Sequence, residues 1–243
     1  MNQTEATLEV ADLPGICSTF PESPEQEIPR DNMVATLQGL LKSNQEIVVV
    51  EGEEGIGKTT LLAQFARANN QHTLSIFVSN ASRYAWDPIL VAQNLNEQIQ
   101  FALGNVPKGK HADTDIQTLL NTSIADLHRK ANAERRQYNF VLDGLEDIPA
   151  EERPAVEQIF DFLPLGLGTF RFIMSGTVEK LNRLRAGRVK MKPWTLPAFS
   201  FDETVKYFAD IPESHEHLDT IYRISQKGVP GKLASIRRLC VSS

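Results

Sequence analysis

The residues with the clearest chemical potential form a glycine-rich segment that ends in lysine and threonine. Gly52-Glu-Glu-Gly-Ile-Gly57-Lys58-Thr59 matches G-x-x-x-x-G-K-[ST] in full, between an apolar run and an amphipathic stretch. Backbone N–H groups of such a loop can surround phosphate oxygens, because glycine permits close approach and positive φ. We predict a phosphate site made of Gly52, Glu53, Glu54, Gly55, Ile56, Gly57, Lys58, Thr59 and Thr60. The alternative is a glycine-rich turn with an incidental lysine.

In this site Lys58 would reach the terminal phosphates, and the Thr59 hydroxyl would bind Mg²⁺. A second group of candidates follows the apolar run Tyr138-Asn-Phe-Val-Leu-Asp143. At the end of a parallel strand next to the phosphate-loop strand, Asp143 can hold Mg²⁺ through a water molecule. Glu146 would orient or deprotonate an attacking water, although Asp147 can take the same role. Lys58 completes the predicted catalytic set. The alternatives are a strand-ending turn for Asp143, and a solvated loop or helix N-cap for the other two acids.

Alternating strands and helices must position these groups. Short apolar runs predict strands at 47–50, 74–78, 140–142 and 171–175. Helical periodicity predicts helices at about 31–43, 58–68, 114–134 and 151–163. A further helix should begin at Asp87-Pro88 and end at a polar loop at 104–113. Thr114 and Gln117 have capping-box spacing, as do Ser200 and Glu203. This alternation predicts an α/β fold whose parallel sheet is covered by helices on both faces.

The two ends of the chain differ from this alternating region. Residues 1–27 are acidic and proline-rich without sustained periodicity, which indicates a flexible leader. Beyond residue 200 only helices are expected, near 201–209, 216–226 and 231–240. We therefore predict a phosphate-binding domain at 28–199 and a small helical lid at 200–243.

Composition excludes several classes of protein. The 243 residues are 41% hydrophobic and 23% charged, which excludes collagen-like, fibrous and wholly disordered chains. A net charge of −6 argues against a surface that binds nucleic acid throughout, although seven basic residues against one acid at 171–192 leave a local contact face open. Two distant cysteines, the absence of a long apolar run and an acidic first segment favour a cytoplasmic protein without a membrane partner.

Together these residues resemble the STAND class of P-loop NTPases, which includes NACHT and NB-ARC modules and is related to AAA+ proteins. The likeness covers about residues 28 to 240. The phosphate loop matches without exception. Ile28-Pro29-Arg30-Asp31 resembles the family's v-G-R-[DE] entry motif, with proline where glycine is usual. Asp143-Gly-Leu-Glu-Asp147 is similar to the family's D-G-[hydrophobic]-D-E motif, with the last two acids reversed. Leu196-Pro-Ala-Phe199 is similar to its l-x-p-[FL] motif, and Gly228-Val-Pro230 is similar to its G-x-P motif.

The resemblance implies an ATP-driven switch that binds ATP/ADP and Mg²⁺ and whose nucleotide state controls self-association. It also implies that the backbone at Pro29 and Arg30 contacts adenine, and that Pro230 contacts the base from the lid. The family's sensor strand usually ends in T-[ST]-R, whereas this strand ends in Ser175-Gly176-Thr177. Thr177 can donate a hydrogen bond to the γ-phosphate but brings no charge, so we expect slow hydrolysis. Arg183 or Arg185 could substitute, although a solvated face is the favoured role for both.

Two other functions stay open at this point. An AAA+-like ATPase that acts on nucleic acid is suggested by the basic stretch alone, and we do not favour it. A metabolic P-loop kinase would need a second substrate pocket. Complete switches of the STAND class carry further domains, so we expect effector and sensor partners outside this chain, which would then be a fragment of a longer protein.

Overall fold

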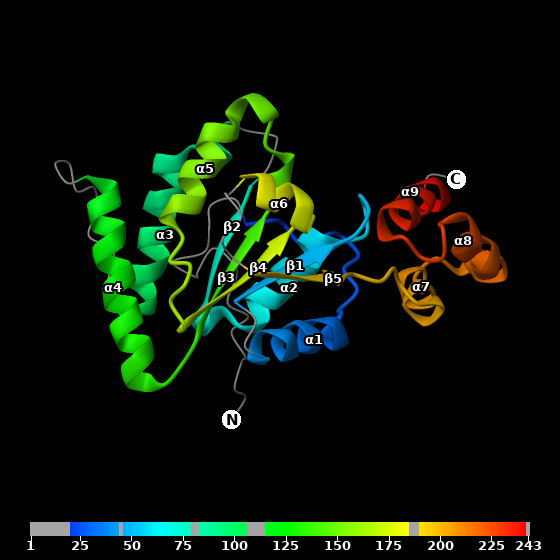
Figure 1. Ribbon diagram of the computed structural model, residues 1–243. Helices are drawn as coiled ribbons and strands as arrows, with labels where there is room; N and C mark the ends of the chain where they lie inside the picture. Colours follow the sequence, from blue (N-terminus) through cyan, green and yellow to red (C-terminus); the bar gives the residue numbers. More distant parts are fainter. Residues whose placement is uncertain (1–19, 44–45, 79–82, 106–114, 185–189, 242–243) are drawn as a thin grey trace.

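The computed structural model describes residues 20–43, 46–78, 83–105, 115–184 and 190–241, and its centre is a five-stranded parallel sheet (Figure 1). The strands lie in the order β2-β3-β4-β1-β5. Their bounds are β1 Ile47–Glu51, β2 Thr73–Phe77, β3 Tyr138–Asp143, β4 Phe170–Ser175 and β5 Met191–Thr195. All four strand pairings are parallel, so the carboxyl ends of the strands meet at one edge of the sheet.

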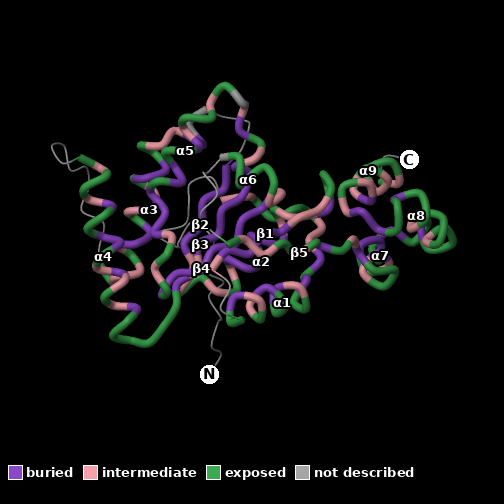
Figure 2. The backbone as a smooth tube through the Cα atoms, in the orientation of Figure 1, coloured by how far each residue is buried: buried purple, intermediate pink, exposed green. Residues whose placement is uncertain are grey.

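Helices cover both faces of this sheet because alternate residues of each strand point to opposite sides. Ile47 and Val49 belong to one hydrophobic core, and Val48 and Val50 belong to the other. The first core is closed by α3 Pro88–Ala102, α4 Ile116–Glu134, α5 Arg153–Phe162 and α6 Val178–Leu184, and the second by α1 Asp31–Lys42 and α2 Lys58–Ala68. Figure 2 shows the buried strands between these two layers. The predicted α/β class, with helices on both faces, is confirmed.

The chain beyond β5 forms a lobe of its own. Three helices, α7 Phe201–Tyr207, α8 Leu218–Ile224 and α9 Pro230–Val241, gather at one end of the molecule in Figure 1. Ser200 and Glu203 form the predicted capping box at the start of α7. The small core of this lid contains Phe199, Phe208 and Leu233, and it also takes in Ile28 from the segment before α1. The lid core therefore contains side chains from both ends of the described chain.

Short 3₁₀ segments connect the longer elements: η2 Asn70–His72, η3 Arg83–Trp86, η4 Leu145–Asp147, η5 Ala150–Glu152 and η6 Pro212–His217. Among the described helices, none has both the length and the apolar character needed to cross a membrane.

Residues 20–27, assigned to the leader from the sequence, make specific contacts. The Phe20 ring packs edge-on against Phe77, with ring centroids 4.9 Å apart. Arg67 of α2 forms an ion pair with Glu27 and donates to Ser23 Oγ at 3.0 Å. This segment therefore lies along α2 before the chain enters α1.

Three details of the sequence-based fold were wrong. Strand β3 was expected next to the phosphate-loop strand β1, but β4 lies between them. Helix α4 begins at Ile116 with Asp115 as its N-cap, whose carboxylate accepts the Thr118 N–H at 3.2 Å; Thr114, the expected cap, lies outside the described residues. Strand β5 was not among the strands predicted from apolar runs, because Lys192 and Pro193 interrupt its apolar character.

Candidate nucleotide site

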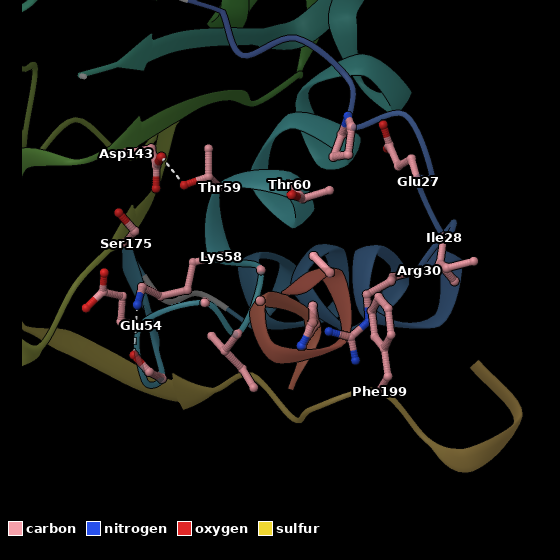
Figure 3. A pocket seen from close by; sticks show the side chains of 18 of the residues that line it. Glu27, Ile28, Arg30, Glu54, Lys58, Thr59, Thr60, Asp143, Ser175 and Phe199 are labelled. Carbon is pink, nitrogen blue, oxygen red and sulfur yellow. Dashed lines mark hydrogen bonds between the residues drawn. The ribbon is translucent and has the colours of Figure 1, made fainter. Parts of the chain in front are cut away.

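The glycine-rich loop connects the end of β1 to the start of α2. Two of its glycines, Gly55 with φ 78° and Gly57 with φ 93°, have left-handed backbone conformations. Residues with a Cβ atom rarely adopt these conformations. Gly57 is the N-cap of α2, so the N–H groups of the first helical turn face the loop. The loop forms one wall of a cavity of about 750 Å³ (Figure 3). A loop of this form can bind an anion through main-chain N–H groups.

Lys58 folds back over the loop. Its ammonium group donates to the carbonyl oxygens of Gly52 at 2.8 Å and Glu53 at 3.3 Å. These backbone acceptors hold the lysine charge at the cavity wall, where phosphate oxygens can replace them. An ammonium group supplies three donors and a point charge, which suits a polyphosphate.

The two predicted metal ligands are in direct contact. Thr59 Oγ1 donates to Asp143 Oδ2 at 2.7 Å, although the two residues come from α2 and the end of β3 (Figure 3). A hydroxyl and a carboxylate are hard oxygen donors of the kind that Mg²⁺ prefers. The residues present therefore fit a magnesium ion that also binds phosphate oxygens.

Asp143 lies in a strongly desolvated position, with 5% of its surface exposed. Burial raises the pKa of its carboxyl group, and hydrogen bonds with Ser175 and Thr59 oppose that rise. Asp147 raises the pKa further, whereas the charge of Lys58 lowers it. A buried carboxylate of this kind gains from a bound cation, because the cation offsets the cost of desolvating its charge.

Glu146 and Asp147 follow Asp143 on the short η4 segment. The turn before it depends on Gly144, because a Cβ there would lie 2.3 Å from the Val78 carbonyl oxygen. The Glu146 side chain is 12% exposed and lies 3.4 Å from Lys180 Nζ, measured from Oε2. Desolvation and the charge of Glu146 raise the pKa of Asp147, and Lys58 and Lys180 oppose the rise. Both acids line the cavity, so the geometry keeps both as candidates for activating water.

Several apolar side chains that line the cavity come from outside the loop. They are Ile28, Phe199 and Tyr207, together with Pro230 and Ala234 of the lid. The buried Arg30 guanidinium lies 5.2 Å from the centre of the Phe199 ring and donates to the carbonyl oxygens of Pro197 and Ala198 at 3.0 and 3.3 Å. Its Nε lies 3.3 Å from Glu203 Oε1 of α7. Arg30 therefore ties the segment before α1 to the lid.

The lid also touches the phosphate loop through main-chain atoms. The Gly231 N–H, in the first turn of α9, donates to the Gly55 carbonyl oxygen at 2.8 Å. A Cβ at Gly231 would lie only 3.0 Å from Gly55 Cα. The preceding residue, Pro230, lines the cavity beside Gly57. The cavity is therefore bounded by sheet, loop and lid together.

Comparison with known proteins places this geometry in a family. Residues 28–169 match the family model described as the AAA ATPase domain. The chain belongs to the AAA ATPase domain family. Membership implies nucleotide binding, with Mg²⁺ as the usual cofactor, and supports ATPase activity.

One solved structure has a fold similar to that of this AAA ATPase domain. A Walker-type ATPase of Pyrococcus abyssi matches with a TM-score of 0.55 and 14% identity, over 88% of this chain and 69% of that one. The ORC2 protein of Aeropyrum pernix, solved in ADPNP and ADP complexes, matches with a TM-score of 0.43 and 15% identity, over 77% of this chain and 53% of that one. At 14% identity the first likeness shows a shared fold. No curated protein matches the sequence.

Most residues predicted from the sequence line the cavity of this AAA ATPase domain. They are Arg30, Gly52, Glu54, Gly55, Ile56, Gly57, Lys58, Thr59, Thr60, Asp143, Glu146, Asp147, Thr177 and Pro230. Pro29 is exposed and does not line the cavity, and Glu53 contributes its carbonyl oxygen to Lys58 instead. Sequence reasoning missed Glu27, Ile28, Ser175, Lys180, Phe199 and Tyr207 as lining residues. Of these, Ile28 and Phe199 lie within motifs that carried the family resemblance, which was a usable signal.

The basic stretch at 171–192 is not exposed at every position in the described chain. Arg171 is buried, and its guanidinium donates to the carbonyl oxygens of Gly168 and Phe170. Arg183, considered as a substitute sensor, forms an ion pair with Glu179 and does not line the cavity. The other candidate, Arg185, lies outside the described residues, as does Arg188.

Proposed function

We propose that this AAA ATPase domain binds ATP with Mg²⁺, hydrolyses it slowly, and acts as a STAND-type switch whose nucleotide state controls self-association. The observation that carries the proposal is the 2.7 Å contact between Thr59 and Asp143, at the base of a glycine-rich loop and inside a cavity that the lid helps to bound. This contact brings a hydroxyl and a carboxylate to one point from elements that are distant in sequence. A structural turn with an incidental lysine would not require it.

Each side chain has a separate part in the proposed reaction. Lys58 exchanges its carbonyl partners for phosphate oxygens, and the loop N–H groups hold the remaining phosphate charge. Thr59 and Asp143 would hold Mg²⁺, which would neutralise charge on the phosphates. Glu146, with Asp147 as the alternative, orients or deprotonates the attacking water. Ser175-Gly176-Thr177 places no arginine at the end of β4, which supports slow turnover.

The lid gives the nucleotide a way to change the shape of the molecule. A nucleotide in this cavity would touch both the loop and Tyr207 and Pro230 of the lid. Arg30 and the bond from Gly231 to Gly55 join the same two parts. A ligand shifts an equilibrium between two lid positions only by its difference in affinity for them, so contacts to both parts are what a switch requires.

The test combines turnover with molecular mass. We expect ATP-dependent phosphate release below about 1 per second, which is the lower end of typical enzyme turnover. We also expect the mass measured by light scattering to differ between ADP and a non-hydrolysable ATP analogue. Lys58→Ala is the control and should show neither effect. An identical mass in both nucleotides would exclude the switch, and phosphate transfer that requires an added acceptor would indicate a kinase instead.

A further inference from the structure

A positive charge lines the phosphate end of the cavity without a role in the function proposed so far. Among the described residues, the basic side chains that line the cavity are Arg30, Lys58 and Lys180. Arg30 forms an ion pair with Glu203 and donates hydrogen bonds to two backbone carbonyl groups. Lys58 belongs to the phosphate loop. Lys180, in the first turn of α6, is therefore the cation whose purpose is unexplained.

Hydrogen bonds hold the backbone around Lys180 near the ends of the adjacent strands β1 and β4. The Val178 N–H donates to Glu51 Oε1 at 2.9 Å, at the end of β1. The Lys180 N–H donates to Thr177 Oγ1 at 3.3 Å, just after β4. The side chain itself is 59% exposed, so the ammonium group can change partners while its backbone stays in place.

In the structure the partner of Lys180 is Glu146, the proposed base. Glu146 Oε2 is buried and accepts no hydrogen bond within the described chain, so the ammonium group 3.4 Å away is its compensating charge. Gly176 makes room for this carboxylate, because a Cβ there would lie 3.1 Å from Oε2. The charge of Lys180 also acts on the neighbouring Asp147, whose pKa it lowers.

We propose that Lys180 is the specificity-determining residue that distinguishes ATP from ADP, an inference that rests on the proposed function. Without a γ-phosphate, Lys180 stays paired with Glu146 and holds this carboxylate away from water. With ATP bound, the more highly charged γ-phosphate takes the ammonium group, and Glu146 is released to orient the attacking water. Lys180 thus supplies, from α6, the charge that Ser175-Gly176-Thr177 lacks.

Calorimetric titration of Mg-ATP and Mg-ADP separates this role from a structural one. For Lys180→Ala we expect about tenfold weaker ATP binding, as for the loss of one charge-assisted contact, and less than about twofold change for ADP. Lys180→Arg should recover most of the preference because it keeps the charge. Arg183→Ala is the matched control: it removes a cation from the same helix, outside the cavity, and should change neither affinity.

A double-mutant cycle tests the exchange of partners. Glu146→Gln frees Lys180 and should raise the ATP-to-ADP affinity ratio by about two- to fivefold, and the same substitution should have no such effect in the Lys180→Ala background. Equal losses for ATP and ADP, or no loss, in Lys180→Ala would overturn this inference and leave the proposed function standing. Absence of ATP binding in the unaltered protein would instead refute the proposed function.

Discussion

The contact between the lid and the phosphate loop can be broken by adding one methyl group. In Gly231→Ala the new Cβ would lie 3.0 Å from Gly55 Cα and 3.2 Å from its carbonyl oxygen. Carbon atoms pack best at about 3.5–4.0 Å, so α9 must retreat by roughly 0.5–1 Å. That movement stretches the 2.8 Å hydrogen bond between Gly231 and Gly55 beyond useful length. The substitution therefore acts on lid closure directly.

Overpacking and the lost hydrogen bond should together cost the closed lid about 1–2 kcal/mol. If ATP binds the closed form, its affinity falls by about 5- to 30-fold. Calorimetric titration measures the change, and Gly39→Ala is the control, because that exposed glycine in α1 has open space around its Cβ position. The control should bind ATP normally and gain about 0.5–1 kcal/mol in stability. Normal ATP affinity in Gly231→Ala would refute the coupling between lid and loop.

Further expected outcomes concern the charged groups. Burial raises the pKa of the Asp143 carboxyl group in the folded, nucleotide-free protein. The stability that this group contributes is therefore present at pH values below its pKa in the unfolded chain, and is lost as the pH rises through its pKa in the folded protein. Asp143→Asn should therefore stabilise the protein at pH 7 by about 1 kcal/mol, which raises the melting temperature, and should make the stability less dependent on pH. A lower melting temperature would contradict this. Arg30→Ala should destabilise the fold by about 2 kcal/mol in urea titrations, and Arg30→Lys should not restore it, because lysine cannot reproduce the contacts to Glu203 and two carbonyl groups. Glu146→Gln should retain ATP binding and lose at least about tenfold in phosphate release; if Asp147→Asn is the damaging change instead, the base is Asp147.

The phosphate loop and the strand that ends in Asp143 could be predicted from the sequence, because each depends on a short, continuous residue pattern. Glycine spacing around Lys58 requires backbone conformations that few other sequences need, and an apolar run followed by acids indicates where a strand ends. The contact of Thr59 with Asp143 followed from the rule that parallel strands end at one edge of the sheet.

The order of the strands was not accessible in the same way. Nothing in the residues of β3 or β4 states which of them pairs with β1, because both are continuous apolar runs that suit any central position. Asp143 nevertheless reaches Thr59 across the intervening β4. Strand β5 escaped prediction because an edge strand tolerates proline and lysine, which are absent from the central strands.

Long-range side-chain partners were the other gap. Arg171 was counted with a basic surface, but its position at the start of a central strand buries it and directs it to backbone carbonyl groups. Lys180 was counted in the same stretch and instead forms an ion pair with Glu146 at the cavity wall. Composition gives the sign of a charge but no information about its partner, which here depends on how α6 is held by α5, β5 and the end of β1.

The central claim is that main-chain N–H groups of the loop and the Lys58 ammonium group bind a polyphosphate. Calorimetric titration of ATP with Mg²⁺ into the unaltered protein and into Lys58→Ala tests it most directly. We predict measurable affinity in the first case and a loss of at least about 100-fold in the second, because a charge-assisted phosphate contact in a partly closed site is removed. Equal ATP affinity in the two proteins would contradict the claim.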